Sequence, residues 1–495
     1  MSVESKTEKR KNQPGVDSLM HLVPALTHSR LIRHTVLNVG QGYIKQAQAK
    51  LPQTPRAEGL KTDSHDFSKA IYTIIDRAIA QDLSPAFYRK VLNLMAEGAN
   101  TGENTETPKT LFKKEHGINP PSFMVVSPGK ACNLQCTGCY ANAGADAEKL
   151  DWNVFDRVLT EARERWGIRF MVISGGEPLA YHSEGKGILD AVEKHPDMLF
   201  MMYTNGTLIT DEVAKRMAEL GNISPAISVE GWRERTDERR GSGVFDKVLV
   251  AMQRLRKAGV PFGMSITATK NNAEELMSDE FMDFFFQQQG ALYSWIFQYM
   301  PIGRSFTLDL MPTPEQRLHM WKRSWELIDQ KHYFLADFWN HGTLTSGCLA
   351  AGQYHGGGYM YIDWNGAITP CVFVPYSPAN IRDIYAQGGN LDNVWKTPFF
   401  SGIRKWQGEY TKENGNWMAP CINRDHHKVL HQLIIETEPD PTDDNAQKAL
   451  LDPDYGRGLE AYDQAYAALT EPIWQDFYLK SSEEGQLRER PLKSD

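Results

Sequence analysis

The sequence predicts an α/β protein built around a partial (β/α)6 barrel, with a helical N-terminal extension and a small C-terminal region that contains a β-hairpin. Two observations support this prediction. From Pro121 onward, short apolar runs alternate with longer amphipathic segments, which is the pattern of βα units in a parallel sheet. Further along, the pair Asn365-Gly366 lies between two β-rich runs, and such a pair is the strongest short-range signal for a hairpin.

Composition limits the class of protein. A chain of 495 residues with 41% hydrophobic content can bury a large core and should divide into two or three domains. The net charge of −8 argues against long-range attraction to nucleic acid or anionic lipid. No apolar run reaches eighteen residues, and residues 1–15 are polar without a following apolar stretch. We therefore expect a cytoplasmic protein with no transmembrane segment and no nucleic-acid partner.

Residues 1–118 are expected to form the N-terminal extension. Its first 60 residues are polar and punctuated by proline, and one stretch from Leu19 to Ile44 mixes apolar and basic residues, so we expect partial order there. Between residues 64 and 97 apolar residues recur at helical spacing. This spacing predicts two amphipathic helices that are separated near Ser84-Pro85.

Residues 119–305 are expected to form the barrel. The longer segments between its apolar runs, such as 152–166, place their apolar residues on one helical face. Six βα units are fewer than the eight of a closed barrel, which indicates an open or partial barrel. The predicted strands cover residues 122–127, 170–174, 199–204, 226–229, 262–267 and 293–300.

Three further segments are expected after the barrel. Residues 306–345 should form a helical bridge, with a helix from Thr313-Pro314 through Lys331. Residues 346–430 carry the predicted hairpin and the last three cysteines. Residues 431–495 begin with an acidic, proline-rich loop at 436–444 and end in a helix near 458–479.

Cysteine spacing is the most informative chemical feature. Six cysteines are too few for a disulfide scaffold in so long a chain, and Cys132, Cys136 and Cys139 fall within eight residues. Three thiolates on a short loop suit an iron–sulfur cluster, because they can bind three corners of a cube. The fourth iron would then remain open to a substrate. The spacing by itself leaves a structural zinc site as the alternative.

The surroundings of this loop favour a catalytic site. The loop follows the first predicted strand, so the metal would lie at the C-terminal end of the barrel strands, where such folds place their chemistry. The second strand ends in Ser174-Gly175-Gly176-Glu177-Pro178. Adjacent glycines let the backbone approach a ligand closely, and a carboxylate beside them can accept hydrogen bonds from an ammonium group.

The motif CxxxCxxCΦ, with Tyr140 as its aromatic residue, and the later GGEP motif resemble the radical S-adenosylmethionine (SAM) superfamily. The resemblance extends from about Pro121 to Arg304. It implies that Cys132, Cys136 and Cys139 bind a [4Fe–4S] cluster whose unique iron is chelated by the amino and carboxylate groups of SAM. It implies these SAM contacts: Tyr140, Gly175, Gly176, Glu177, Asn205, Ser228 and Arg240.

The same resemblance suggests a role for several of these contacts. Residues 175–177 would hold the methionine amino group, and Tyr140 would lie near the adenine. A related maturase-like branch reads S-[IL]-D-G followed by D-x-x-R, which matches Ser228 and Arg240 to contacts with the ribose and the carboxylate of SAM. An arginine suits the second task because its guanidinium can pair with a carboxylate through two hydrogen bonds. Glu230 replaces the commoner Asp, so its own role stays open.

Three more cysteines, Cys348, Cys371 and Cys421, predict a second cluster. The segment from Gly366 to Cys371 is similar to the G-x4-C element of the auxiliary-cluster domains called SPASM and twitch. A full SPASM domain has about seven cysteines and two clusters, so three cysteines leave room for one extra cluster at most. The alternatives are buried thiols that act as small hydrophobic residues, or a zinc site completed by histidines.

A second cluster with three thiolates would again lack one protein ligand. Either Asp425, His426 or His427 supplies it, or the fourth iron is open to the substrate, as in the molybdopterin-precursor cyclase that the family includes. At the end of the sixth predicted strand, Arg304 should face the barrel mouth. Arg304 is therefore a candidate residue of the adenosine or substrate pocket.

The resemblance implies reductive cleavage of SAM to a 5′-deoxyadenosyl radical under anaerobic conditions. Such an enzyme needs a low-potential electron donor such as ferredoxin or flavodoxin. Many peptide maturases of the family begin with a winged-helix domain, whereas residues 60–100 are predicted to be helical here, which favours a small-molecule or lipid substrate. The alternatives are a peptide-modifying maturase and an iron–sulfur electron-transfer or binding protein that does not cleave SAM.

Overall fold

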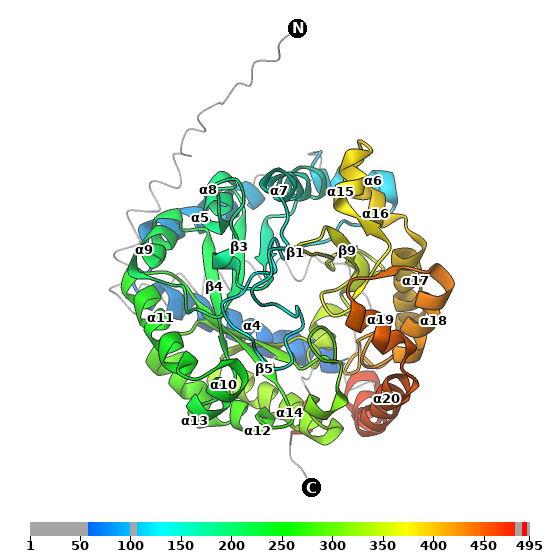
Figure 1. Cartoon of the computed structure of the whole chain (residues 1–495). Helices are drawn as coiled ribbons and strands as arrows, with labels where there is room; N and C mark the ends of the chain where they lie inside the picture. Colours follow the sequence, from blue (N-terminus) through cyan, green and yellow to red (C-terminus); the bar gives the residue numbers. More distant parts are fainter. Residues whose placement is uncertain (1–57, 100–105, 481–487, 493–495) are drawn as a thin grey trace.

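The computed structural model describes residues 58–99, 106–480 and 488–492. Expectations for residues 1–57, including the stretch from Leu19 to Ile44, therefore lie outside the described residues. Among the described helices, none is long and apolar enough to cross a membrane. Strands occupy the centre of the molecule and helices surround them (Figure 1).

A parallel sheet forms the core, as predicted. Six strands pair in sequence order, each parallel to the next. Their apolar side chains are almost entirely buried, because helices cover the outer face and the inner face curves around the barrel interior. The strands are β1 (Met124–Val126), β2 (Phe170–Ile173), β3 (Leu199–Thr204), β4 (Ile223–Val229), β5 (Gly263–Ala268) and β6 (Tyr293–Gln298).

The sheet extends beyond the six predicted strands at both edges. Strand β7 (Phe334–Asp337) pairs parallel with β6, although the sequence had indicated only helix between residues 306 and 345. Strand β8 (Tyr361–Ile362) pairs parallel with β1. Both strands have four residues or fewer, and such short runs acquire strand character from a neighbouring edge rather than from their own periodicity.

The predicted hairpin is confirmed. β8 and β9 (Ala367–Thr369) are antiparallel, and Gly366 between them adopts a left-handed conformation with φ 85°. The Asp363 carboxylate accepts hydrogen bonds from the N–H groups of Asn365 and Ala367, which closes the turn. Because β8 also pairs with β1, the hairpin is part of the main sheet rather than of a separate domain.

Helices cover the outside of the sheet (Figure 1). The predicted helix at 152–166 is observed at those bounds and ends at Gly167, which is left-handed with φ 66°. The α-helices are α4 (Glu58–Ala80), α5 (Pro85–Ala99), α6 (Pro108–His116), α7 (Trp152–Trp166), α8 (Ile188–Lys194), α9 (Asp211–Leu220), α10 (Arg233–Arg240), α11 (Val244–Ala258), α12 (Ala273–Leu276), α13 (Asp279–Asp283), α14 (Pro314–Lys331), α15 (Ile381–Ala386), α16 (Asp392–Trp395), α17 (Pro398–Lys412), α18 (His427–Thr437), α19 (Asp444–Leu451) and α20 (Pro453–Ile473).

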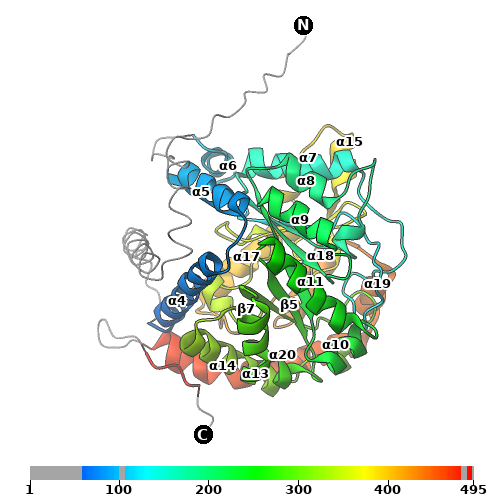
Figure 2. The ribbon, with the colours of Figure 1, turned by 90° about the vertical axis from the view of Figure 1, so that its left-hand side faces the viewer.

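The two predicted N-terminal helices are α4 and α5, which are separated at residues 81–84. Helix α4 runs across one end of the barrel, behind the strands in Figure 1 and along one side of the molecule in Figure 2. It packs against β7 and α14. We call this end, where β1–β6 begin, the lower end, and the end where they finish the upper end.

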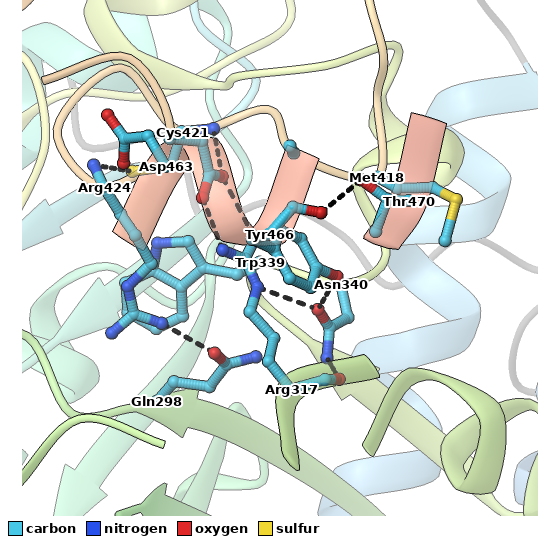
Figure 3. A network of polar contacts seen from close by, with 12 residues as sticks. Gln298, Arg317, Trp339, Asn340, Met418, Cys421, Arg424, Asp463, Tyr466 and Thr470 are labelled. Carbon is cyan, nitrogen blue, oxygen red and sulfur yellow. Dashed lines mark hydrogen bonds and ion pairs between the residues drawn. The ribbon is translucent and has the colours of Figure 1, made fainter. Parts of the chain in front are cut away.

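A buried ion pair joins α14 to the C-terminal segment. Arg317 of α14 donates hydrogen bonds to both carboxylate oxygens of Asp425, one of them at 3.0 Å, and neither side chain is exposed. The guanidinium lies 3.7 Å from the centre of the Tyr466 ring of α20 and also donates to Asn340 (Figure 3). This network fixes the loop before α18 between α14 and α20.

We expect Arg317→Met to lower the free energy of unfolding by about 3–5 kcal/mol, because Asp425 would become a buried carboxylate without its counter-charge. Denaturant unfolding followed by circular dichroism measures the change. The control is Arg457→Met, whose partner Asp454 is 84% exposed, and which should cost about 1 kcal/mol or less. Equal losses in the two variants would contradict this account.

Candidate functional site

A cavity of about 660 Å³ occupies the barrel interior, and all six cysteines line it. We call it the central cavity. The loop between β1 and α7 carries Cys132, Cys136 and Cys139 at the upper end, and we call these the upper cysteines. The second cysteine set, Cys348, Cys371 and Cys421, lines the same cavity from the C-terminal segment. The fold therefore brings together two groups of thiols that are far apart in the sequence.

The upper cysteines lie close enough to influence each other. The pKa of the Cys132 thiol is raised to about 11, chiefly by burial and in part by the nearby Glu177, Cys136 and Cys139. The N–H of Leu134 donates to the Cys132 sulfur at 3.4 Å. None of the six cysteines forms a disulfide, so each thiol is free to bind metal.

Distances separate the cluster interpretation from the zinc alternative. Four ligands around one zinc ion place their sulfur atoms on the order of 4 Å apart. Within the described part of the chain, the only three potential metal ligands that lie within 4.8 Å of one another are Glu115, His116 and Asp392, which are outside the cavity. Neither cysteine set is as compact as a single zinc ion requires.

Gly175 and Gly176 pack against the loop that leads to Cys132. The N–H groups of Gly176 and Glu177 donate to the carbonyls of Gly129 and Ala131 at 2.9 and 2.8 Å. A Cβ atom on Gly176 would lie 2.2 Å from the Lys130 carbonyl oxygen, and Gly175 has φ 133°. Only glycines allow this approach. Both glycines line the cavity, as expected for residues that meet a ligand with their backbone.

Glu177 is placed differently from the two glycines. Its carboxylate accepts hydrogen bonds from the Thr204 hydroxyl at 2.7 Å and from the N–H of Asn205 at 2.8 Å. The side chain is fully buried and does not line the cavity. Its observed contacts join the end of β2 to the end of β3. Burial raises the pKa of Glu177, and these hydrogen bonds partly offset the rise.

The other predicted SAM contacts surround the upper part of the cavity. Tyr140 exchanges a hydrogen bond of 2.6 Å with Ser174, a pairing that the sequence did not indicate. The Asn205 amide lies 3.9 Å from the Cys132 sulfur and donates to Asn133 at 2.9 Å. Ser228, near the end of β4, lines the same wall.

Glu230 organises the positive charge at the site. This carboxylate has no exposed surface and accepts from Arg240 at 2.8 Å and from Arg239 at 2.6 Å. Arg240 also reaches to 3.9 Å from the Cys136 sulfur. Burial lowers the pKa of Arg240, but the charge and hydrogen bond of Glu230 and the nearby Cys136 and Cys139 together outweigh it, so the net direction is upward. Two arginines therefore line the cavity, whereas the sequence interpretation had selected only Arg240.

Arg304 helps to position the loop that carries the upper cysteines. It donates to the backbone carbonyls of Cys136 and Ala143, the first at 3.2 Å. It does not line the cavity. The side chain therefore supports the cysteine loop from behind instead of facing the mouth of the barrel.

Cys371 of the second set is buried, and Cys348 and Cys421 are partly buried. The Tyr359 hydroxyl lies 2.8 Å from the Cys371 sulfur, and the N–H of Arg424 donates to Cys421 at 3.4 Å. The pKa of Cys421 is raised to about 12, chiefly by burial and in part by the neighbouring Asp425 and Cys348. Uncoordinated thiols in this set would stay protonated at neutral pH, so metal binding must displace protons.

Two of the three candidates for a fourth ligand, Asp425 and His426, have hydrogen-bond partners, whereas the Nδ1 atom of the buried His427 ring has none among the described residues. Asp425 is taken up by Arg317 and by the N–H of Cys421 at 3.0 Å. A ring nitrogen of His426 lies 3.0 Å from the Ala419 carbonyl, and its ring contacts Trp406 and Tyr410. His427 packs on Tyr455. In the structure as described, none of the three lines the cavity.

Known proteins share this architecture. Residues 126–280 match the model of the Radical SAM superfamily. Mycofactocin maturase MftC of Mycobacterium tuberculosis is 28% identical over 330 residues, which cover 63% of this chain and 82% of MftC. AdoMet-dependent heme synthase of Methanosarcina barkeri is 26% identical over 294 residues, which cover 54% of this chain and 80% of the synthase.

A solved structure supports the fold. SuiB of Streptococcus suis, bound to its precursor peptide SuiA, matches with a TM-score of 0.50 and 19% identity, covering 64% of this chain and 79% of SuiB. The loop that carries the upper cysteines and the segment with Gly175 and Gly176 both lie within the matched residues 126–280. Residues 126–280 therefore form a radical SAM domain, the kind of domain that uses a [4Fe–4S] cluster and SAM.

Proposed function

We propose that the upper cysteines hold the SAM-binding cluster and that the enzyme abstracts hydrogen from a C–H bond of a substrate bound in the central cavity. One observation supports this best: a single cavity is lined by the upper cysteines, by six of the seven predicted SAM contacts and by the second cysteine set. When bound, cluster and SAM supply a 5′-deoxyadenosyl radical after one-electron reduction. The protein then has to bind, orient and shield the reactants.

The surrounding residues suit this task. The backbone of Gly175 and Gly176 lines the cavity where the methionine end of SAM is expected, and Glu177 holds that segment against β3. Arg239 and Arg240, both held by Glu230, place positive charge where a carboxylate would pair with it. Tyr140 and Ser174 form one edge of the cavity, where the adenine is expected.

The second cysteine set would hold one further cluster. Asp425 and His426 have other partners and none of the three candidate ligands lines the cavity, so the fourth position of that cluster would face the cavity and the substrate. An external low-potential donor such as ferredoxin or flavodoxin would supply the electron.

Two substrate classes remain as candidates. The relatives favour a peptide over the small molecule or lipid that the helical N-terminal segment favoured, because MftC is named a maturase and SuiB is bound to a precursor peptide. A heme synthase is also among the relatives, so related chains with similar sequence act on non-peptide molecules.

We expect anaerobically reconstituted enzyme to contain about eight irons per chain if both cysteine sets bind cubane clusters. Replacing Cys348, Cys371 and Cys421 together by alanine should leave about four irons and preserve SAM binding. Replacing Cys132, Cys136 and Cys139 should leave the other four and abolish SAM binding. Iron and sulfide analysis with electron paramagnetic resonance measures both. A wild-type value near four would remove the second cluster from this proposal.

Reaction with dithionite and SAM should yield 5′-deoxyadenosine from the wild type and none from the variant without upper cysteines. Deuterated peptide and lipid fractions then identify the attacked molecule, because the abstracted deuterium appears in 5′-deoxyadenosine. Mass spectrometry measures this transfer. Absence of 5′-deoxyadenosine under fully reducing conditions would contradict the proposed reaction.

Gly176→Ala should slow SAM cleavage by roughly tenfold or more, because the new Cβ would displace the carbonyls of Lys130 and Ala131 and move the cysteine loop. The rate of 5′-deoxyadenosine formation measures the effect. Gly456→Ala is the matched control, since no heavy atom lies within 4 Å of its Cβ position. A Gly176→Ala enzyme with wild-type rate and iron content would show that the close approach is dispensable.

A further inference from the structure

The central cavity extends through the barrel from one end to the other. Along β2 its lining begins at Phe170, the first residue of the strand, and continues to Gly175 and Gly176 beyond the strand's end. At about 3.3 Å per residue this is roughly 15 Å. At the lower end the lining includes Phe67 and Ile71 of α4.

The wall of the cavity changes from apolar to polar along the strands. Near the lower end it presents Phe123 before β1, Phe170 at the start of β2 and Phe334 at the start of β7. Near the upper end it presents Asn205 after β3 and Arg240, the last residue of α10. SAM is a charged molecule whose predicted contacts all lie in the upper half. The second cysteine set lines the lower half, because Tyr359 stacks on Phe123 and its hydroxyl lies 2.8 Å from the Cys371 sulfur. The space between this set, Phe170 and α4 is left for the substrate.

Two ionisable side chains of the lower half, Asp337 and His341, form hydrogen bonds with other groups of the protein. The Asp337 carboxylate accepts from the N–H groups of Trp339 and Asn340. One ring nitrogen of His341 pairs with Ser324 at 2.9 Å, and the other accepts from the N–H of Asp337. Burial lowers the pKa of His341 to about 3, so the ring is neutral.

The lower end of the cavity also has an apolar rim. Ile71 and Phe170 line the cavity and are nevertheless 38% and 36% exposed. Ile75, one helical turn after Ile71, is also exposed. Among the described residues only seven large hydrophobic side chains are exposed, and three of them are these. An apolar rim that continues into an apolar cavity is typical of an entry path for a hydrophobic ligand.

A peptide segment fits this lower half poorly. Each peptide residue brings an N–H and a C=O group that must find partners when they leave water. The lower wall offers a few hydroxyl groups, such as those of Ser64 and Ser68 in α4 and of Tyr359, but the phenylalanine side chains that make up most of its aromatic surface have nothing to donate or accept. A hydrocarbon chain has no such requirement and gains free energy from burial.

We propose that the lower half of the central cavity binds the aliphatic chain of a lipid-like substrate, which enters past Ile71 and Phe170. The inference rests on the proposed function and names its substrate class. A hydrogen atom passes from a C–H bond of the chain to the 5′ carbon of the deoxyadenosyl radical. The products are 5′-deoxyadenosine and a carbon radical on the chain.

Binding of cis-parinaric acid, a fatty acid that fluoresces in apolar surroundings, tests the proposal on the anaerobically reconstituted full chain. Wild type should bind the probe saturably, and palmitate should displace it. Ile71→Asp and Phe170→Asp should each weaken binding at least tenfold. Ser68→Trp, which narrows the entry by bulk instead of charge, should do the same.

Ile435→Asp and Leu451→Asp are the matched controls, because these exposed apolar side chains lie outside the cavity. They should bind the probe within twofold of wild type. The proposal is overturned if wild type shows no saturable binding, or if the entry variants and the controls behave alike. It is also overturned if deuterium reaches 5′-deoxyadenosine only from a peptide.

The same preparations separate this inference from the proposed function. If wild type forms 5′-deoxyadenosine from SAM but does not bind the probe, the lipid-chain inference alone fails. If no 5′-deoxyadenosine forms with the cluster present and reduced, the proposed reaction itself fails, whatever the probe does.

Discussion

The upper site depends on one close contact, in which the backbone after β2 packs against the backbone before Cys132. The N–H groups of Gly176 and Glu177 pair with the carbonyls of Gly129 and Ala131, and a Cβ at Gly176 would lie 2.2 Å from the Lys130 oxygen. This contact sets the cysteine loop over the ends of the parallel strands. It also explains why Glu177 is buried: its carboxylate holds the glycine segment to β3 and so keeps the pairing in place.

A buried carboxylate pairs with arginine beside each of the two cysteine sets. Glu230 holds two arginines toward the upper cysteines, and Asp425 is held by Arg317 while it accepts the N–H of Cys421. Breaking either pair would leave an uncompensated charge away from water, which is costly. Because a broken pair would be so unfavourable, each ion pair favours one arrangement of the cysteine loop beside it. Arg424 links the two sides, since it donates to Gln298 at the end of β6 at 2.6 Å (Figure 3).

Much of the fold followed from local patterns. Apolar runs and helical spacing placed β1–β6, α4, α5 and α7 close to their observed bounds, and Asn365-Gly366 marked a real turn. Strand β7 and the pairing of β8 with β1 were not anticipated, because segments of two to four residues carry no periodicity and join a sheet only by pairing with its edge. Arg239 and Ser174 were missed because their contacts with Glu230 and Tyr140 form only in the folded chain.

The sequence by itself determined how the chemistry begins, because thiol spacing and a glycine pair are local features that dictate which metal cluster and ligand the loop can hold. Only the tertiary structure decided that both cysteine sets line one cavity and that this cavity becomes apolar toward α4. It also showed that Asp425 and His426 have other partners and that His427 does not line the cavity. The physical reason is that a cavity wall is assembled from single residues on many strands, and no stretch of sequence records which of them will face one another.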